Sequence, residues 1–240
     1  MSDVILVGLP YIAVALAILV GVYRFKTDTF SHSSFSSQLL ENQKLFWGSA
    51  LWHYAIVLIL LAHFIAFLIP PLWGVIYGGA TVAFEAFGLI LSLVGFLALG
   101  WLMMRRFSSR RVFVVTSRMD WVVVSLLLLQ MALGFLVALS YRWGGQWFVS
   151  STAPWLWSLA TLNPQADYVS AMPFLVQLHF LVGFLLIALY PFSRLVHLVF
   201  FPIHYLWRPY QRVIWNRAPR PGLGAARSVP EDIRLRRLSS

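Results

Sequence analysis

Residues 121–141 read WVVVSLLLLQMALGFLVALSY, a run of 21 residues without a charged side chain. At about 1.5 Å per residue, a helix of this length crosses the roughly 30 Å hydrocarbon core of a bilayer. Four other stretches have the same character. The five predicted spans are Val4–Val22, Phe46–Ile69, Ala86–Met104, Trp121–Tyr141 and Phe174–Phe192, the last running on past Arg194 towards Phe201. The sequence therefore predicts an all-α integral membrane protein with five transmembrane helices.

The composition of the 240-residue chain agrees with this prediction. Hydrophobic residues make up 60% and charged residues 11%, against about 45–50% and about 25% in an ordinary soluble domain. Such a chain cannot cover itself with polar side chains, which excludes a soluble globular protein. It also contains no cysteine, which excludes disulfides, thiolate zinc sites and cysteine-ligated iron–sulfur clusters.

The positively charged residues fall almost entirely on one side of the spans. Three lie between the first and second spans, five between the third and fourth, and nine from Arg194 onward, which is 17 of the 18 Lys and Arg residues. Basic loops of membrane proteins face the cytoplasm. We therefore expect the N-terminus outside and the C-terminus in the cytoplasm. Because this topology explains the net charge of +10, there is no reason to expect a nucleic acid partner.

Two regions flank the last predicted span. Trp143–Ala166 carries no charge but contains Gly, Gln, Asn and two prolines, so we expect it to lie in the interface on the outer side. Its tryptophans fit the aromatic belt at a headgroup boundary; they are Trp143, Trp147, Trp155 and Trp157. We expect residues 1–204 to form the membrane domain, and residues 205–240 to form a basic cytoplasmic tail, disordered or docked on a partner.

Four histidines fall within the predicted spans or at their ends. His53 and His63 are on the second span, and His179 and His197 are on the fifth. Ionisable side chains inside a membrane are costly and mark functional sites by default. The second span runs outward and the fifth runs inward. His53 and His197 are therefore predicted to lie at a similar depth near the inner face and to form a pair. The same argument pairs His63 with His179 near the outer face.

Two histidines on facing helices can fill both axial positions of a haem iron, which suits electron transfer. The two pairs therefore predict two haems b; the alternative is that the histidines bond to the backbone or line a pore. The axial separations differ, about 15 Å for His53–His63 and about 27 Å for His179–His197. We expect helix tilt and a kink at Pro191 to absorb this difference. His32 and His204 lie outside the spans, and we expect them to be solvated or to face a partner.

Several motifs surround these histidines. SSQLL at residues 36–40 precedes His53 and His63, and PFSRLVH at residues 191–197 follows His179. Smaller motifs are Arg105-Arg106 with Ser108-Ser109-Arg110, Gln130 with Ala132-Leu133-Gly134, Pro202, Tyr205-Leu206 and Tyr210-Gln211. Together they resemble the gamma, or cytochrome b, subunit of membrane-bound respiratory nitrate reductase. The resemblance covers about residues 8–214.

The resemblance implies a subunit of the bacterial inner membrane that oxidises menaquinol or ubiquinol from the quinone pool near the outer face. Electrons then cross the lipid bilayer to an iron–sulfur beta subunit and to a molybdenum alpha subunit that reduces nitrate in the cytoplasm. His63 and His179 would hold the distal haem b. His53 and His197 would hold the proximal haem b.

Two features depart from the family pattern. Ala62 stands before His63 where other members have Gly, and no lysine follows Lys44, although the family's quinol site is associated with a lysine after the second span. Glu85 is the nearest ionisable group. We expect it either to accept a quinol proton or to stabilise a helix N-terminus at the start of the third span. Aromatic side chains that could hold a quinone ring lie nearby; they are Phe64, Phe67, Trp73 and Tyr77.

Arginines near the inner face are candidates for binding haem propionates. Arg194, three residues before His197, either binds a propionate or snorkels to the interface. Arg110, Arg111 and Arg118 are weaker candidates that otherwise mark the inner face. Asp120 opens the fourth span, so we expect it to stabilise that helix N-terminus or to form a salt bridge.

Gln130 lies in the middle of the fourth span, where we expect it to hydrogen-bond between helices rather than to touch a haem.

Two functional alternatives remain. One is a cytochrome b anchor of another redox complex, such as a sulfur-metabolism or heterodisulfide-reductase-like assembly. The other is a haem-free anchor or a transporter that uses histidines for protons.

Overall fold

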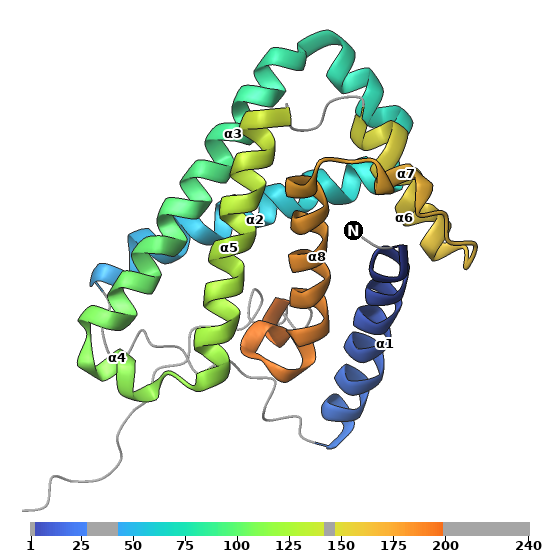
Figure 1. The fold of residues 1–240 in the computed structure, drawn as a ribbon. Coiled ribbons are helices and arrows are strands. Elements are labelled where there is room, and N and C mark those ends of the chain that lie inside the picture. Colours follow the sequence, from blue (N-terminus) through green and yellow to red (C-terminus); the bar gives the residue numbers. More distant parts are fainter. Residues whose placement is uncertain (1–2, 28–42, 142–146, 199–240) are drawn as a thin grey trace, which may run out of the picture. The chain divides into compact units, whose positions relative to one another are not determined.

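Five long helices dominate the computed structural model (Figure 1), which describes residues 3–27, 43–141 and 147–198. They are α1 (Asp3–Thr27), α2 (Gln43–Leu68), α3 (Pro70–Ser108), α5 (Arg118–Tyr141) and α8 (Phe174–Leu189). Within the described residues, these are the five helices long and apolar enough to cross a membrane, and all regular structure is helical. The predicted all-α fold with five spans is therefore confirmed, while the predicted orientation of the termini stays a prediction.

The remaining elements are short. They are α4 (Arg110–Val115), the π-helix η3 (Phe148–Thr152), α6 (Ala153–Ala160), α7 (Asp167–Ser170) and the 3₁₀-helices η4 (Tyr190–Phe192) and η5 (Arg194–Leu198). All of the described residues belong to one compact unit. His32, His204 and the predicted tail of residues 205–240 lie outside the described residues.

The connection between the second and third predicted spans, residues 70–85, is helical. α3 begins at Pro70 and consists of two helices joined across a kink at Ala80, the non-helical residue, with φ −142° and ψ 33°. Proline is well tolerated in the first turn of a helix, because the N–H groups there have no partner within the helix. Pro70 and Pro71 therefore start a helix instead of breaking one. The apolar part that can cross the membrane runs from Ala80 to Ser108.

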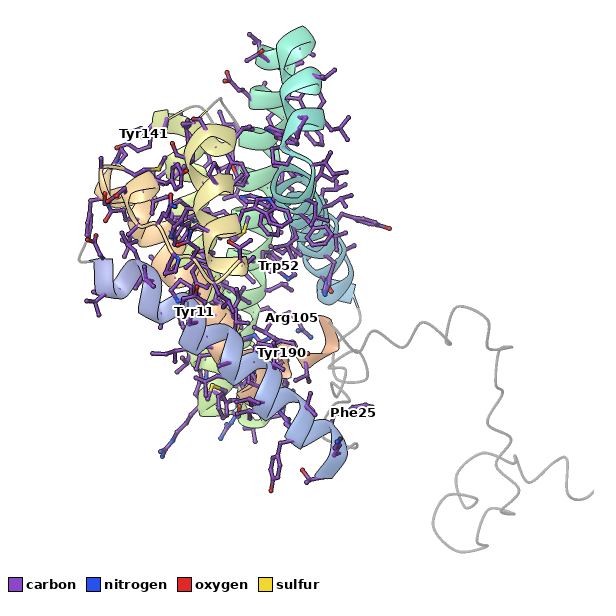
Figure 2. The ribbon with its side chains drawn as sticks, turned by 90° about the vertical axis from the view of Figure 1, so that its right-hand side faces the viewer. Tyr11, Phe25, Trp52, Arg105, Tyr141 and Tyr190 are labelled. Atoms are coloured by element: carbon purple, nitrogen blue, oxygen red, sulfur yellow. The ribbon has the colours of Figure 1, made fainter. Side chains whose placement is uncertain are left out.

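The long helices pack as a series of neighbours. α2 packs on α3, α3 on α5, α5 on α8, and α8 on α1. Small residues allow close approach along α3: a Cβ built at Gly95 would stand 3.3 Å from the Cβ of Ala55 on α2. The α2–α3–α5 contact has a core that includes Trp52, Leu99 and Met131. Many large side chains left exposed on these helices are aliphatic or aromatic, as a lipid-facing surface requires (Figure 2).

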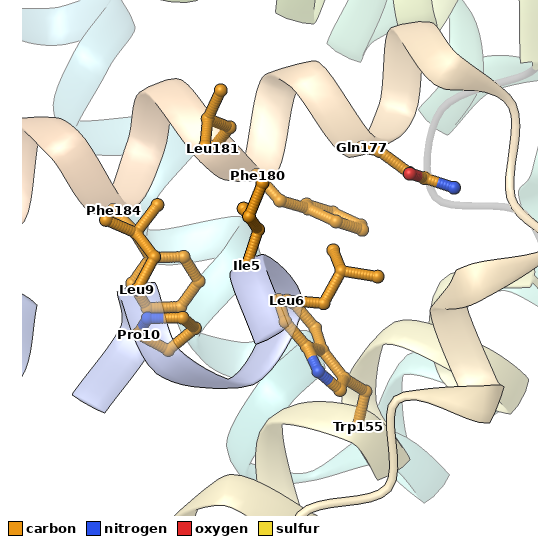
Figure 3. Close-up of a pocket in the computed structure, with 9 residues that line it drawn as sticks. All are labelled: Ile5, Leu6, Leu9, Pro10, Trp155, Gln177, Phe180, Leu181 and Phe184. Atoms are coloured by element: carbon orange, nitrogen blue, oxygen red, sulfur yellow. The ribbon is translucent and has the colours of Figure 1, made fainter. Parts of the chain in front are cut away.

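The segment predicted for the outer interface includes η3 and α6, and Trp155 of α6 packs on α1 and α8. Trp155 is only 1% exposed and lies against Phe180 and Phe184 of α8 and Leu6 of α1 (Figure 3). Trp155, which the sequence places in an aromatic belt, is therefore covered by α1 and α8. Trp157 is 42% exposed, as expected of a belt residue.

Candidate functional site

The two histidines of α2 are anchored to their own helix. Nδ1 of His53 lies 2.7 Å from the main-chain oxygen of Ser49, and Nδ1 of His63 lies 2.8 Å from that of Ile59. Because a carbonyl oxygen only accepts hydrogen bonds, each Nδ1 donates, and the neutral ring carries its lone pair on Nε2. A metal-ligating histidine normally has this arrangement, in which the nitrogen that is not a ligand donates to a carbonyl or a carboxylate.

His179 is held by a different helix. Its Nε2 lies 3.4 Å from Nε2 of Gln130 on α5, which confirms that Gln130 bonds between helices. Among the described residues, Nδ1 of His179 and Oε1 of Gln130 are buried without a hydrogen-bond partner. Buried polar atoms are normally paired. A bound polar group that pairs with these two atoms would satisfy them.

The two histidines of the predicted outer pair lie on α2 and α8. The ring of Phe148 from η3 stands edge-on to His63, with the ring centroids 6.0 Å apart and the planes at 88°. Ala62, the residue before His63, packs in the adjacent small cluster around Ala66 and Trp73. The ligand role of this histidine pair stays a prediction.

The inner pair is described only in part. His53 is exposed on α2, and the backbone of His197 lies in η5, while the side chain of His197 is outside the described side chains. The break predicted at Pro191 is present: α8 ends at Leu189, the chain continues as η4, and Ser193 is extended with φ −121° and ψ 178°. The pairing of His53 with His197 stays a prediction.

An arginine that the sequence analysis did not single out stabilises this break. Nη1 of Arg24, in the last turn of α1, donates to the main-chain oxygen of Pro191 at 2.6 Å and to that of Ser193 at 3.4 Å. The last carbonyls of a helix have no partner within the helix. Arg24 therefore ties the segment that carries His197 to α1, across 167 residues of sequence.

Asp120 has both of the roles expected of it. Its Oδ2 accepts the main-chain N–H of Ser117 at 2.9 Å, and the hydroxyl of Ser117 accepts the N–H of Asp120 at 3.1 Å, which is a reciprocal cap on α5. Its Oδ1 also lies 3.2 Å from Nε of Arg194. Arg194, expected to bind a propionate or to snorkel, therefore binds the carboxylate of Asp120.

The other arginines predicted to lie near the inner face differ in burial. Arg110 is exposed at the start of α4, Arg118 is exposed at the start of α5, and the side chain of Arg111 lies outside the described side chains. Arg105 is the buried one, at 7% exposure (Figure 2). Arg105 continues a buried face of α3 that is formed by Ser92, Gly95 and Ala98. Successive members of this face are three, three and seven residues apart, with Arg105 the last. This helical periodicity is the sequence signal that could have identified Arg105.

The predicted role of Glu85 at a helix N-terminus stays a prediction. α3 is kinked at the non-helical residue Ala80, and Glu85 lies five residues later, near the start of the part of α3 that can cross the membrane. It is half-buried, and it has an interaction partner in the structure. Its role as a proton acceptor stays a prediction.

The aromatic residues expected near a quinone ring have different surroundings. Phe64 is exposed on α2, while Trp73 is buried beside Phe84. The ring of Phe67 stacks on Trp157 with centroids 5.1 Å apart, and the indole N–H of Trp157 donates to the main-chain oxygen of Phe67 at 2.9 Å. The side chain of Tyr77 lies outside the described side chains. These contacts join α6 to the C-terminal end of α2.

Within the described part of the chain, no group of three or more His, Cys, Asp or Glu side chains could hold a metal ion by itself. A haem iron is held mainly by its porphyrin and needs from the protein only axial ligands. His53, His63 and His179, each in contact with a carbonyl or an amide, are compatible with that simpler requirement.

Comparisons with known proteins match most of the chain. The family model for the nitrate reductase gamma subunit matches residues 2–216. The chain is 30% identical to the nitrate reductase gamma chain of Bacillus subtilis, over 88% of this chain and 97% of that protein. It is 32% identical to the respiratory nitrate reductase 1 gamma chain of Escherichia coli, over 85% of this chain and 93% of that protein.

A longer relative matches equally well. The chain is 30% identical to the nitrate reductase-like protein NarX of Mycobacterium tuberculosis, over 88% of its own length. It spans only about a third of the length of that protein, since 33% is covered.

Proposed function

Because this chain belongs to the nitrate reductase gamma subunit family, we propose that it is the membrane subunit of a quinol:nitrate oxidoreductase that carries two haems b. Nitrate would be reduced by a partner subunit and not by this chain. Its task is to take electrons from quinol near the outer face of the inner membrane and to deliver them to the cytoplasmic side. The feature that carries this proposal is the set of histidines on α2 and α8–η5.

His63 and His179 would hold one haem on the outer side, and His53 and His197 would hold the other on the inner side. A haem b ligated by two histidines exchanges single electrons and has no open position for oxygen chemistry. The carbonyls of Ser49 and Ile59 support this role, because they hold the Nδ1 hydrogens of His53 and His63 and leave the lone pairs on Nε2. A neutral imidazole with its lone pair on Nε2 is the form that can bind iron.

The quinol would be menaquinol or ubiquinol and would bind near the outer end of α2. Aromatic and aliphatic side chains with a few polar groups are typical of such sites. The exposed ring of Phe64 and the stacked pair of Phe67 and Trp157 supply that surface. The carboxylate of Glu85, half-buried on the neighbouring helix α3, would take a proton released by the quinol.

The partners would be an iron–sulfur beta subunit and a molybdenum alpha subunit on the cytoplasmic side, with lipid around the spans. The strong excess of Lys and Arg on one side of the spans supports this arrangement, because basic loops face the cytoplasm. Electrons would thus cross the membrane while protons are left outside.

A spectrum tests the central part of the proposal. Membranes that contain the full chain with its partner subunits should give a reduced-minus-oxidised b-type signal, and haem extraction should give two haems per chain. A complex that is assembled but contains no haem would contradict the proposal. Such a result would favour a haem-free anchor.

A matched pair of variants tests the quinol side. Glu85→Gln removes the carboxylate but keeps the side-chain size, so it should slow haem reduction by quinol and leave both haems bound. Asp167→Asn is the control, because Asp167 is an exposed acidic residue on the same predicted side of the membrane. Equal rates of haem reduction in Glu85→Gln and Asp167→Asn would remove Glu85 from the mechanism.

A further inference from the structure

The ring of His179 fits into a notch on α5. A Cβ built at Gly134 would stand 3.2 Å from Cε1 of His179 and 3.9 Å from its Nδ1. The first distance is shorter than an ordinary van der Waals contact between carbon atoms. Any side chain larger than hydrogen at position 134 would therefore push the imidazole away from α5.

Gln130 lies one turn before this notch and contacts the same ring. Its amide nitrogen is a donor, so Nε2 of His179 accepts the 3.4 Å hydrogen bond and the ring hydrogen is on Nδ1. On its other side the amide is fitted against α8 itself, since a Cβ at Gly183 would stand 3.3 Å from Nε2 of Gln130.

The three described histidines on the spans thus share one tautomer. His53 and His63 donate from Nδ1 to the carbonyls four residues earlier in α2. His179 has its lone pair on Nε2 because the Gln130 amide donates to that nitrogen. The neighbouring helix α5 therefore does for His179 what α2 does for its own two histidines.

We propose that Gly134 and Gln130 form a positioning site on α5 that sets the orientation and the tautomer of His179. When a haem is bound, Nε2 of His179 would leave the Gln130 amide and bind iron. Gly134 and Gln130 are positioning residues, because they act through His179. The proposal rests on the proposed function for the identity of the ligand. The contacts on which it stands exist in the cofactor-free chain, so part of it can be tested without a haem.

The first test measures the tautomer directly. The full chain is prepared without haem in detergent, with ¹⁵N-labelled histidine, and the His179 signals are assigned by their loss in His179→Ala. The hydrogen should be found on Nδ1 in the unaltered chain, and Gln130→Leu should give a mixture of both tautomers. A hydrogen on Nε2 in the unaltered chain, or no change in Gln130→Leu, would overturn the proposal.

The second test measures the fit of the ring with the haem-loaded complex. Gly134→Ala adds one methyl group against His179, and Gly100→Ala on α3 is the matched control, because a Cβ there meets no atom within 4 Å. Overpacking by a methyl group should weaken haem binding at the outer site roughly tenfold. It should also shift the midpoint potential of that haem, while the inner haem signal reports that the chain is folded.

The outcomes distinguish failure of the positioning role from failure of the proposed haem-binding function. Haem affinity and potential in Gly134→Ala equal to those in Gly100→Ala would overturn the positioning role. An assembled complex without haem would refute the proposed function instead, and the tautomer measurement would then decide the positioning role alone.

Discussion

α2 and the segment α8–η5 carry the same kind of residue but hold it in opposite ways. Both histidines of α2 bond to carbonyls of α2 itself. The α8–η5 segment depends on its neighbours throughout: His179 on Gln130 and Gly134 of α5, Arg194 on Asp120 of α5, and the break at Pro191 on Arg24 of α1.

The difference follows from helix continuity. α2 is an uninterrupted helix, so a carbonyl four residues before each histidine is always in reach of its ring. α8 ends at Leu189, and the chain beyond it has lost regular α-helical bonding. A broken helix end leaves main-chain groups that other elements must satisfy. We therefore expect changes on α1 and α5 to alter the α8–η5 side of the site and to leave α2 unaffected.

The largest effects should come from the histidines themselves, and they test whether the two helices pair as predicted. His63→Ala and His179→Ala should each abolish the same haem signal, the outer one. His53→Ala and His197→Ala should each abolish the other signal. Redox titration of membranes monitored by absorbance resolves the two haems. If His53→Ala and His63→Ala abolished one and the same signal, both ligands of that haem would be on α2 and the comparison between α2 and α8 would fail.

The next largest effect should come from Arg24→Met, which keeps the length of the side chain but removes the donor to Pro191 and Ser193. A buried acceptor left without its partner costs about 1–3 kcal/mol. We expect partial loss of the inner haem with the outer haem retained, because the backbone of His197 follows directly after this break. Haem content and thermal unfolding in detergent measure the effect. Lys26→Met is the control, because Lys26 is an exposed cation in the same last turn of α1.

A smaller effect is expected at the start of α5. Asp120→Ala removes the cap on Ser117 and the partner of Arg194, which should lower the free energy of unfolding by about 1–2 kcal/mol. Asp120→Asn keeps a capping oxygen and removes the charge, so it should cost less than about 1 kcal/mol, because Arg194 is half-exposed and water screens the pair. Thermal unfolding of both variants separates the cap from the ion pair. Equal losses would mean that the ion pair alone stabilises this corner.

These contacts also show how far the sequence could predict the fold. Apolar runs of about 20 residues identified all five spanning helices, because crossing a bilayer demands length and hydrophobicity alone. The helical start of α3 at Pro70 was missed, because two prolines are typical of a connection as well as of a first helical turn. The burial of Trp155 was missed because the residues that cover it, Leu6 and Phe180, are remote in sequence.

In the candidate site too, contacts between residues near in sequence could be predicted, and contacts between remote residues could not. The anchoring of His53 and His63 depends on residues four positions away, so a helix prediction is enough to foresee it. The contact of His179 with Gln130 joins residues 49 positions apart, and that of Arg24 with Pro191 joins residues 167 apart. Hydropathy predicts that such polar groups need partners, but only the packing of the helices determines which partners they have.

The smallest effect is expected at Ser49, and it tests whether α2 really anchors its histidines by its backbone. The Ser49 hydroxyl lies 3.3 Å from Nδ1 of His53, while the main-chain oxygen of the same residue lies 2.7 Å from that nitrogen. Ser49→Ala removes the hydroxyl and keeps the carbonyl, so the tautomer of His53 should be unchanged. We expect the haem content to equal that of the unaltered protein and the potential of the inner haem to shift only slightly. Loss of the inner haem in Ser49→Ala would show that a side chain, and not the helix backbone, holds His53, and α2 would then resemble α8.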